Sequence, residues 1–424
     1  MKLDVASILK ATNGKAYNVI GNIKFVGVSI DSREELLGKF FIPLKGQNHD
    51  GHDFLKEAYN KGAILFSEKE IDLPHIRVNS TYEALKSLAK YYLSLFSIPV
   101  VGITGSVGKT TTKDIIASVL DKKFNTVKTE GNFNNEIGLP LTIFKVTEET
   151  EVLVLEMGMN QLGEIHRLAD IARPSITIIT NIGEAHIEFL GSKENIKKAK
   201  MEILDFSPEH IILNGDDEML QNIEGANYYY FKDASNINHK GLLGTTFTLN
   251  LEGESFEATI PIPGDYMISN SIVAAKVGFL LGLTPHEIQL GIKDFKSSNN
   301  RMKIEKVRNL NIINDTYNAS PSSMKAVIEL LSIQEGERIL ILGDMFELGE
   351  FAETYHKEVG EFALNKVDKI YSIGTMAKNY GGIHFETREE FLSSDEFENL
   401  KNLEATVLFK ASRGMMFEQI IEKL

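Results

Sequence analysis

Apolar runs and amphipathic segments alternate through the middle of the chain. Each run is rich in β-branched and aliphatic residues, and a segment with apolar residues at helical spacing follows it. Continuous apolar strands that alternate with helices are typical of a parallel sheet covered on both faces. We predict strands over residues 100–104, 151–157, 175–182 and 210–216, and helices over residues 110–120, 162–172, 193–204 and 266–281.

One segment of this region has a different period. Apolar and polar residues alternate between residues 245 and 262, and Glu252 and Gly253 interrupt the alternation near its centre. A period of two around a glycine-containing turn predicts an antiparallel hairpin. We therefore expect a small antiparallel element beside the parallel sheet.

The two ends of the chain predict two further domains. From about residue 299 onward strand and helix patterns alternate again, and the first 97 residues mix short strands with short helices. The predicted domains are residues 1–97, 98–297 and 298–424. In the last domain strands are expected over residues 310–315, 338–343, 369–373 and 406–410, and helices over residues 322–331, 355–364, 389–397 and 415–423. In the first domain strands are expected over residues 23–33, 39–46 and 63–66, and helices over residues 53–62 and 82–96.

Composition narrows the functional classes. The chain has 424 residues, which is too long for one core and favours two or three domains. The net charge is −14 and no basic cluster stands out, so we expect neither nucleic acid nor an anionic membrane as a partner. The absence of cysteine excludes disulfides, thiolate metal sites and cysteine nucleophiles. No apolar run approaches the roughly 18 residues of a membrane span. Because the N-terminus also lacks the apolar core of a signal peptide, we expect a cytoplasmic protein.

The strongest chemical signal follows the first strand of the middle region. Thr104-Gly-Ser-Val-Gly-Lys-Thr-Thr111 places a glycine-rich turn between this strand and a helix. Backbone N–H groups and the helix dipole can cradle phosphates at such a turn. Lys109 could reach the β- and γ-phosphates, and the Thr110 hydroxyl could ligate Mg²⁺. The early glycine of the general pattern falls at Gly105 instead of Ile103, and the alternative is a plain turn before a surface lysine.

Polar residues follow the later strands at the same predicted sheet edge. Glu156 ends a buried strand, where an acid can position Mg²⁺ beside a nucleotide, and the alternative is a structural carboxylate. His186 lies just past the next strand, which favours a metal ligand over a structural histidine. Arg301 and Asp315 lie at the second domain junction. Closure of this junction over a nucleotide would exclude water and protect a reactive intermediate.

Four further residues carry a weaker signal. Lys200 lies on a predicted helix, where a lysine is usually solvated. Asn132, Asn134 and Asn135 concentrate amides in one loop. These amides suit hydrogen bonds to a sugar or phosphate, although asparagine is also an ordinary loop residue.

Several stretches together resemble the Mur ligases, which are ATP-dependent amide-forming enzymes of peptidoglycan precursor synthesis. They lie in the family's order through all three predicted domains, so the resemblance covers nearly the whole chain. The stretches are residues 104–111, 131–140, 156–158, 181–192, 269–275, Arg301, 315–324 and 342–349.

The resemblance implies a role for each candidate residue. ATP would be bound by Gly105, Ser106, Gly108, Lys109, Thr110, Thr111, Asn270, Arg301 and Asp315. The UDP-linked substrate would be bound by Ser32, Arg33, Lys45, Gly46, Asn132, Asn134 and Asn135, and the incoming dipeptide by Asn318, Ser320 and Ser322. Mg²⁺ would be served by Thr110, Glu156, His186 and Lys200, and catalysis by Lys109, Glu156, His186 and Lys200. Lys200 matches the family lysine that is often carbamylated, which would make it an anionic oxygen ligand.

The resemblance also implies a fold and a reaction. We expect three α/β domains: a small mixed domain, a central P-loop domain with a parallel sheet, and a Rossmann-like C-terminal domain. The expected reaction joins D-alanyl-D-alanine to UDP-N-acetylmuramoyl-tripeptide through an acyl phosphate, with ATP and Mg²⁺, in a monomer. The alternatives are a sister Mur or folylpolyglutamate-type ligase, a P-loop NTPase without ligase activity, and a non-catalytic nucleotide-binding module.

Overall fold

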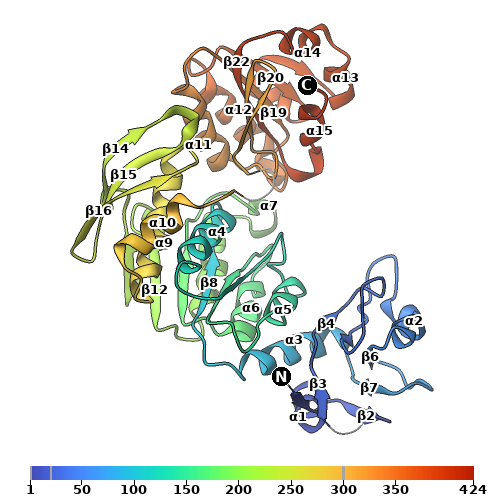
Figure 1. The fold of residues 1–424 in the computed structure, drawn as a ribbon. Helices are drawn as coiled ribbons and strands as arrows, with labels where there is room; N and C mark the ends of the chain where they lie inside the picture. The colour runs from blue at the N-terminus through green and yellow to red at the C-terminus, as the bar shows by residue number, and fades with distance from the viewer. Residues whose placement is uncertain (1, 20–21, 298–300) are drawn as a thin grey trace.

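The chain folds around three larger sheets that follow one another along a curved molecule. The computed structural model describes residues 2–19, 22–297 and 301–424. The sheet of the middle region lies at the centre of the curve, with the N-terminal elements at one end and the C-terminal elements at the other (Figure 1). The fold is α/β, as predicted. The predicted boundary before residue 298 falls on residues 298–300, which lie outside the described residues.

The middle sheet has six parallel strands in the order β13-β12-β11-β8-β10-β9. Every residue of the adjacent interior strands β11, β8 and β10 is buried, which explains their continuous apolar sequences. The strands are β8 (Val100–Thr104), β9 (Thr126–Lys128), β10 (Val152–Glu156), β11 (Ile176–Ile179), β12 (His210–Asn214) and β13 (Ala226–Tyr229). The helices are α4 (Lys109–Leu120), α5 (Gly138–Ile143), α6 (Glu164–Ala172), α7 (Ile187–Leu190), α8 (Lys193–Met201), α9 (Asp265–Leu280) and α10 (Pro285–Lys293).

The apolar pattern predicted the interior strands of this sheet but not its two edge strands. β9 and β13 have three and four residues and are only half-buried or exposed at most positions. Such short strands lack an apolar run of their own. These segments are strands because they pair with β10 and β12, and the local sequence does not predict that pairing.

The predicted hairpin is confirmed beside the parallel sheet. Strands β15 (Thr245–Leu251) and β16 (Glu254–Ile260) pair antiparallel, and β14 (Ala234–His239), which was not predicted, adds a third strand. Glu252 and Gly253 form the turn with φ values of 52° and 81°. Two left-handed residues in a two-residue loop match the twist of the flanking strands.

The C-terminal sheet also has six strands, in the order β17-β18-β22-β19-β20-β21. Only the edge pair β17 and β18 is antiparallel. The strands are β17 (Lys303–Val307), β18 (Leu310–Asn314), β19 (Glu337–Gly343), β20 (Lys369–Ile373), β21 (Ile383–Phe385) and β22 (Ala405–Lys410). The helices are α11 (Pro321–Ser332), α12 (Ala352–Ala363), α13 (Arg388–Leu392), α14 (Asp395–Leu400) and α15 (Glu418–Ile421).

Two helix predictions in this region were wrong in extent. The single helix expected over residues 389–397 is two helices, because Ser394 caps the second one by accepting a hydrogen bond from the Phe397 backbone N–H. The helix expected over residues 415–423 is only α15, preceded by a short 3-10 turn over Arg413–Met415. Met416 has a φ of 51° and separates the two.

The N-terminal region contains a five-stranded sheet in the order β2-β7-β6-β5-β4 and a separate pair of β1 with β3. The long strand predicted over residues 23–33 was wrong, because Gly27 has a φ of 147° and divides it into β3 and β4. The strand predicted over residues 39–46 is reduced to β5. The strands are β1 (Lys2–Asp4), β2 (Lys15–Tyr17), β3 (Asn22–Lys24), β4 (Val28–Ser29), β5 (Phe40–Phe41), β6 (Ile64–Ser67) and β7 (His75–Arg77), and the helices are α1 (Val5–Thr12), α2 (Leu55–Asn60) and α3 (Thr81–Leu93).

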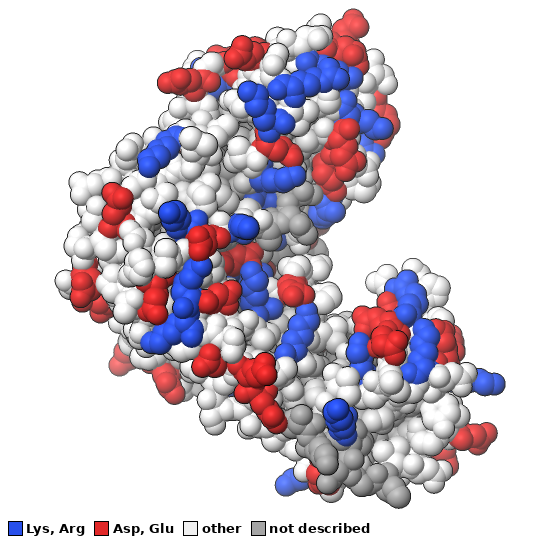
Figure 2. All heavy atoms as spheres, in the orientation of Figure 1, with Lys and Arg blue, Asp and Glu red and all other residues white. Residues whose placement is uncertain are grey.

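Acidic and basic side chains are interspersed over the face of the molecule seen in Figure 2. Within the part of the chain that the structure describes, no helix has the length and apolar character needed to cross a bilayer.

Candidate active site

A cavity of about 880 Å³ lies between the middle and C-terminal regions. Its walls come from loops at the carboxyl ends of parallel strands in both sheets, which is the usual ligand position in open α/β sheets. Lys109, Glu156 and His186, which the sequence predicted at one sheet edge, all line it. The other predicted residues on its walls are Ser106, Gly108, Thr110, Thr111, Asn132, Asn134, Asn135, Asn270, Arg301, Asp315, Asn318 and Ser320.

The glycine-rich loop has the geometry of a phosphate cradle. Gly105 has a φ of 148°, and a Cβ added there would lie 1.9 Å from Thr180 Oγ1. The Nζ of Lys109 donates to the carbonyl oxygens of Gly105 at 2.6 Å and Ser106 at 3.3 Å. Burial lowers the pKa of Lys109, and the carboxylate of Glu156 opposes this effect. A bound polyphosphate would supply the additional negative charge that this buried ammonium lacks.

Asn181 holds the loop in this shape and was not among the predicted site residues. Its Oδ1 accepts from the Val107 backbone N–H at 2.9 Å, and its Nδ2 donates to the Val107 carbonyl oxygen at 2.9 Å. The Ser106 hydroxyl accepts from the Gly183 backbone N–H at 2.8 Å. The residues after β11 therefore brace the loop from the neighbouring strand. An asparagine near the end of the apolar run over residues 175–182 was the available sequence signal.

The carboxylate of Glu156, at the end of β10, accepts hydrogen bonds from two of the other predicted site residues. The side chain is buried, its Oε2 accepts from Thr110 Oγ1 at 2.7 Å, and its Oε1 accepts from Asn134 Nδ2 at 2.7 Å. Hydroxyl and carboxylate oxygens are the ligands that Mg²⁺ prefers, usually one or two from the protein with the rest from phosphates and water. Among residues 2–19, 22–297 and 301–424, no group of three or more acidic or histidine side chains could hold a metal alone. The donor set therefore fits an ion that is completed by a nucleotide.

Lys200 is buried on α8 and does not line the cavity. Burial lowers its pKa well below the ordinary lysine value, and the positive charge of Lys109 lowers it further. No hydrogen bond or ion pair of its amine is found within the described part of the chain. Both effects favour the neutral amine of Lys200, which lies close enough to Lys109 to be affected by its charge.

Two buried polar atoms of α9 at the cavity lack a partner among the described residues: Asn270 Nδ2 and the Tyr266 hydroxyl. Asn270 Oδ1 accepts from Thr112 Oγ1 at 3.1 Å, which orients the amide. The negative charge of Asp315 adds to burial in raising the pKa of Tyr266 well above its ordinary value. A buried donor without a partner is costly unless a ligand supplies one. The sequence named Asn270 and missed Tyr266, although the two residues share one face of the helix, four positions apart.

We expect Tyr266→Phe to weaken ATP binding and to stabilise the free protein. A lost hydrogen bond to a ligand should raise the dissociation constant for ATP by about 2- to 10-fold. Removing the buried hydroxyl should also raise the midpoint of thermal unfolding of the ligand-free protein. Calorimetric titration and thermal unfolding check the two effects, with Tyr228→Phe as a control outside the cavity. Unchanged ATP affinity would contradict this role.

The C-terminal wall holds Arg301 and Asp315 in contact with other side chains. The Arg301 guanidinium lies 3.8 Å from the ring centroid of Tyr317. The Asp315 carboxylate accepts from Lys410 Nζ and, at 3.2 Å, from the Met302 backbone N–H. Tyr317 and Lys410 line the cavity and were not among the predicted site residues. The positions of both residues at the cavity depend on how separate strands and loops come together, and the local sequence does not predict this.

Of the three residues predicted to bind the dipeptide, two line the cavity and one does not. Asn318 and Ser320 line the cavity, whereas Ser322 does not. The Ser322 hydroxyl donates to the carboxylate of Glu184 in the middle region. Glu184 also pairs with Lys193 at 2.6 Å. Ser322 therefore takes part in a contact between the two regions.

The residues predicted to hold the UDP end fall into two separate groups. The N-terminal group lies outside the lining of the cavity, whereas the three asparagines lie on its wall. Arg33 is exposed, pairs with Asp31 at 2.6 Å, and lowers the pKa of Asp31 to about 2. Lys61 Nζ donates to the Ser32 carbonyl oxygen at 2.6 Å. Lys45 and Gly46 form a turn in which the Gly46 N–H donates to the His49 carbonyl oxygen at 2.9 Å.

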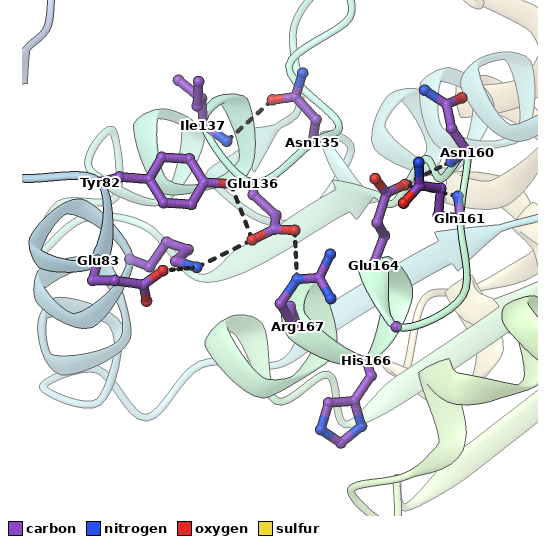
Figure 3. A network of polar contacts seen from close by, with 12 residues as sticks. Tyr82, Glu83, Asn135, Glu136, Ile137, Asn160, Gln161, Glu164, His166 and Arg167 are labelled. Carbon is purple, nitrogen blue, oxygen red and sulfur yellow. Dashed lines mark hydrogen bonds and ion pairs between the residues drawn. The ribbon is translucent and has the colours of Figure 1, made fainter. Parts of the chain in front are cut away.

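A polar network fixes the asparagine-rich loop to α3 and α6 (Figure 3). The Glu136 carboxylate accepts from Tyr82 at 3.1 Å, from Lys86 at 3.1 Å and from Arg167 at 2.6 Å. Burial alone would raise the pKa of Glu136, but these cationic partners lower it. Glu136 and Tyr82 both line the cavity, so the network shapes the wall next to Asn135. None of these four residues was predicted.

The fold and the site define an ATP-dependent ligase with a P-loop in its middle domain. Residues 103–278 match the family model described as Mur ligase middle domain, and residues 300–413 match the one described as Mur ligase, glutamate ligase domain. A relative from Bacillus subtilis (strain 168) is 40% identical, with 94% of this chain and 93% of the relative covered. This chain belongs to the Mur ligase family. The Bacillus relative is named UDP-N-acetylmuramoyl-tripeptide--D-alanyl-D-alanine ligase, and so is one from Escherichia coli (strain K12) at 32% identity over 95% of this chain and 94% of the relative.

Solved structures agree with the family assignment. A crystal structure of MurF from Acinetobacter baumannii superposes with a TM-score of 0.92 at 28% identity, covering 100% of this chain and 99% of that chain. A MurF ligase from Thermotoga maritima, in complex with ADP, superposes with a TM-score of 0.83 at 32% identity, covering 94% and 96%. The predicted α/β fold class is confirmed, with a central parallel sheet that carries the P-loop and a second, Rossmann-like sheet in the C-terminal region.

Proposed function

We propose that this protein joins D-alanyl-D-alanine to UDP-N-acetylmuramoyl-tripeptide with cleavage of ATP to ADP and phosphate, in peptidoglycan precursor synthesis. One observation carries the proposal. A phosphate loop with its buried acid and a wall of the C-terminal sheet enclose the same cavity of about 880 Å³. Relatives named for this reaction match over nearly their whole length.

Each region of the chain would supply one substrate. The N-terminal residues Ser32, Arg33, Lys45 and Gly46 would hold the uridine diphosphate end, and the three asparagines of the middle loop the rest of that substrate. The P-loop would hold the ATP phosphates, and Asn270, Arg301 and Asp315 the nucleoside end. Asn318 and Ser320 would meet the dipeptide. We infer that the three domains are residues 1–97, 98–297 and 298–424, in a cytoplasmic monomer.

The chemistry follows from placing a carboxylate beside a triphosphate. A carboxylate is a poor acylating agent, so its oxygen attacks the γ-phosphorus and ADP leaves, giving an acyl phosphate. The amine of D-alanyl-D-alanine then attacks the acyl carbon, and the tetrahedral intermediate expels phosphate to leave the amide. Lys109 stabilises the negative charge on the transferring group, because its ammonium is fixed in a buried loop. Closure of the two regions over the bound substrates would keep water from hydrolysing the acyl phosphate.

Thr110, Glu156 and His186 would hold Mg²⁺, with Lys200 as a carbamate. When bound, the ion would neutralise charge on the phosphates of ATP. Thr110 and Glu156 already share a hydrogen bond of 2.7 Å, so both oxygens point to one place. The neutral amine of Lys200 is the form that reacts with carbon dioxide, with loss of one proton, to give a carbamate.

We expect ADP release to require both UDP-N-acetylmuramoyl-tripeptide and D-alanyl-D-alanine. A coupled assay for ADP, run with each substrate left out in turn, measures this requirement. Turnover should fall to background in either omission, because the acyl phosphate forms only on the tripeptide and is discharged only by the amine. Equal turnover without the dipeptide would instead support an NTPase. Glutamate accepted in place of the dipeptide would support a folylpolyglutamate-type ligase.

A further inference from the structure

Glu347 of the C-terminal region contacts a predicted catalytic residue of the middle region. Its Oε2 lies 2.6 Å from His186 Nδ1, and its carbonyl oxygen accepts from the Glu188 backbone N–H at 3.2 Å. Both the side chain and the backbone of Glu347 therefore dock on residues 186–188. Glu347 and His186 both line the cavity that also contains Lys109.

Both partners have a strained backbone. His186 has a φ of 66° and Glu347 a φ of 62°, and neither is a glycine. Residues other than glycine rarely adopt this left-handed region, and such strain persists only where surrounding contacts enforce it. The His186 carbonyl oxygen accepts from the Phe189 and Leu190 N–H groups, which fixes the turn. The two strained turns therefore present their side chains to each other.

The contact determines which imidazole nitrogen faces the ligand. Glu347 Oε2 lies within ion-pair distance of Nδ1, although the contact lacks hydrogen-bond geometry. A carboxylate at this position favours the proton on Nδ1 and leaves Nε2 on the other side of the ring. A carboxylate that supports a histidine in this way commonly orients it toward a metal or a reacting group. Here the supporting carboxylate comes from a different region of the chain than the histidine. The orientation of His186 thus depends on contact between the two regions.

We propose that Glu347 is a positioning residue for phosphoryl transfer, which orients the His186 imidazole toward the γ-phosphate end of the cavity only when the C-terminal region is docked. The inference rests on the proposed function. Under this proposal, the C-terminal region would both hold the dipeptide and complete the ATP site. Acyl phosphate would then form only in molecules whose acceptor domain is already in place.

Kinetics of three variants test the role. Glu347→Ala should lower kcat by about 10- to 100-fold, the usual effect of losing such a supporting group, with little change in KM for ATP or D-alanyl-D-alanine. Glu347→Gln should lose less, because the amide keeps the size of the carboxylate and an oxygen that can face Nδ1. Glu350→Ala is the matched control, since this exposed acid lies in the same segment and makes no hydrogen bond or ion pair among the described residues. A kcat of Glu347→Ala equal to that of Glu350→Ala, or a change confined to KM for the dipeptide, would overturn the proposal.

Isotope exchange separates phosphoryl transfer from the later steps. With ATP labelled by ¹⁸O in the β,γ-bridge and with UDP-N-acetylmuramoyl-tripeptide but no dipeptide, reversible acyl phosphate formation scrambles the label. Glu347→Ala should slow scrambling by the same factor as kcat. Unaffected scrambling with reduced ligation would place Glu347 at the amine step and reject its action through His186.

Histidine NMR provides a readout that does not depend on turnover. In protein labelled with ¹⁵N-histidine, the His186 signals are assigned by their loss in His186→Gln. The ligand-free wild type should show the Nδ1–H tautomer at His186, and Glu347→Ala should shift it toward Nε2–H, whereas Glu350→Ala should not. The same tautomer in all three proteins would reject the contact as the orienting element. A wild type that lacks ligase activity but shows the predicted tautomers would reject the proposed function alone.

Discussion

Replacing Lys109 by alanine is expected to lower the rate of ligation by about 10²- to 10³-fold, the usual loss when one donor to a charged transition state is removed. The ammonium of Lys109 is held by two carbonyl oxygens of its own loop on a half-buried side chain, and a water molecule at the same position would not carry its charge. The loss should appear in kcat and in isotope scrambling alike, because both require transfer of the γ-phosphoryl group. A coupled ADP assay and the scrambling experiment measure the two effects.

The control for this variant is Lys122→Ala. Lys122 follows the same helix and pairs with Asp294 at 2.5 Å on the surface, away from the cavity. It should keep wild-type kinetics, and thermal unfolding of Lys109→Ala should show an intact fold. Ligation by Lys109→Ala at the rate of Lys122→Ala would remove the P-loop from the mechanism.

Replacing Lys200 by methionine is expected to lower kcat by about 10²-fold or more, as for loss of a group that stabilises charge in the transition state. Methionine has a similar length and fits a buried site, but it cannot form a carbamate. Short carboxylic acids such as acetate should restore part of the activity of the smaller variant Lys200→Ala, because a carboxylate resembles the missing carbamate. The rate without acetate and with it, measured by the coupled assay, checks this expectation. Full activity of Lys200→Met would contradict any role for a carbamate.

A carbamate can also be observed directly. Wild-type protein equilibrated with ¹³C-bicarbonate should show a carbamate resonance by ¹³C NMR that Lys200→Met lacks. If the resonance persists in the variant, it belongs to another amine. This measurement avoids mass spectrometry, in which the labile carbamate is lost.

The same substitution should stabilise the protein in buffer free of carbon dioxide. The Lys200 amine is buried without a partner in the described structure, and the cost of burying such a donor is about 1–3 kcal/mol. The pH dependence has a defined sign, because burial lowers the pKa of Lys200 in the folded state. Between the ordinary lysine pKa of about 10.4 and the lowered value, the unfolded chain binds a proton that the folded chain does not. Acidification through this range should therefore destabilise the wild type more than Lys200→Met, as urea unfolding at several pH values would show.

These two lysines mark different limits of what sequence can reveal. Lys109 could be assigned from its neighbours, because a strand, a glycine turn and a helix in that order build the phosphate loop locally. Lys200 lies on an ordinary helix, and the sequence alone left a solvated lysine as the alternative. Only packing shows that its amine is buried beside Lys109.

The sequence by itself determined the interior strands, the hairpin and the residues at strand ends. Apolar period and motif spacing are local properties, so β8, Glu156 and His186 could be placed from short windows. Parallel pairing then brings strand ends to one edge, which is why Lys109, Glu156 and His186 share a cavity.

Only the tertiary structure decided the pairings between distant segments. Thr112 and Asn270 are 158 residues apart and yet share a hydrogen bond, and the contacts of Glu347 with His186 and of Ser322 with Glu184 join different sheets. The edge strands β9 and β13 likewise exist because a neighbouring strand offers its backbone. The reason is physical: a period or a motif reports the conformation of a few consecutive residues, whereas these contacts depend on how whole sheets and helices pack together.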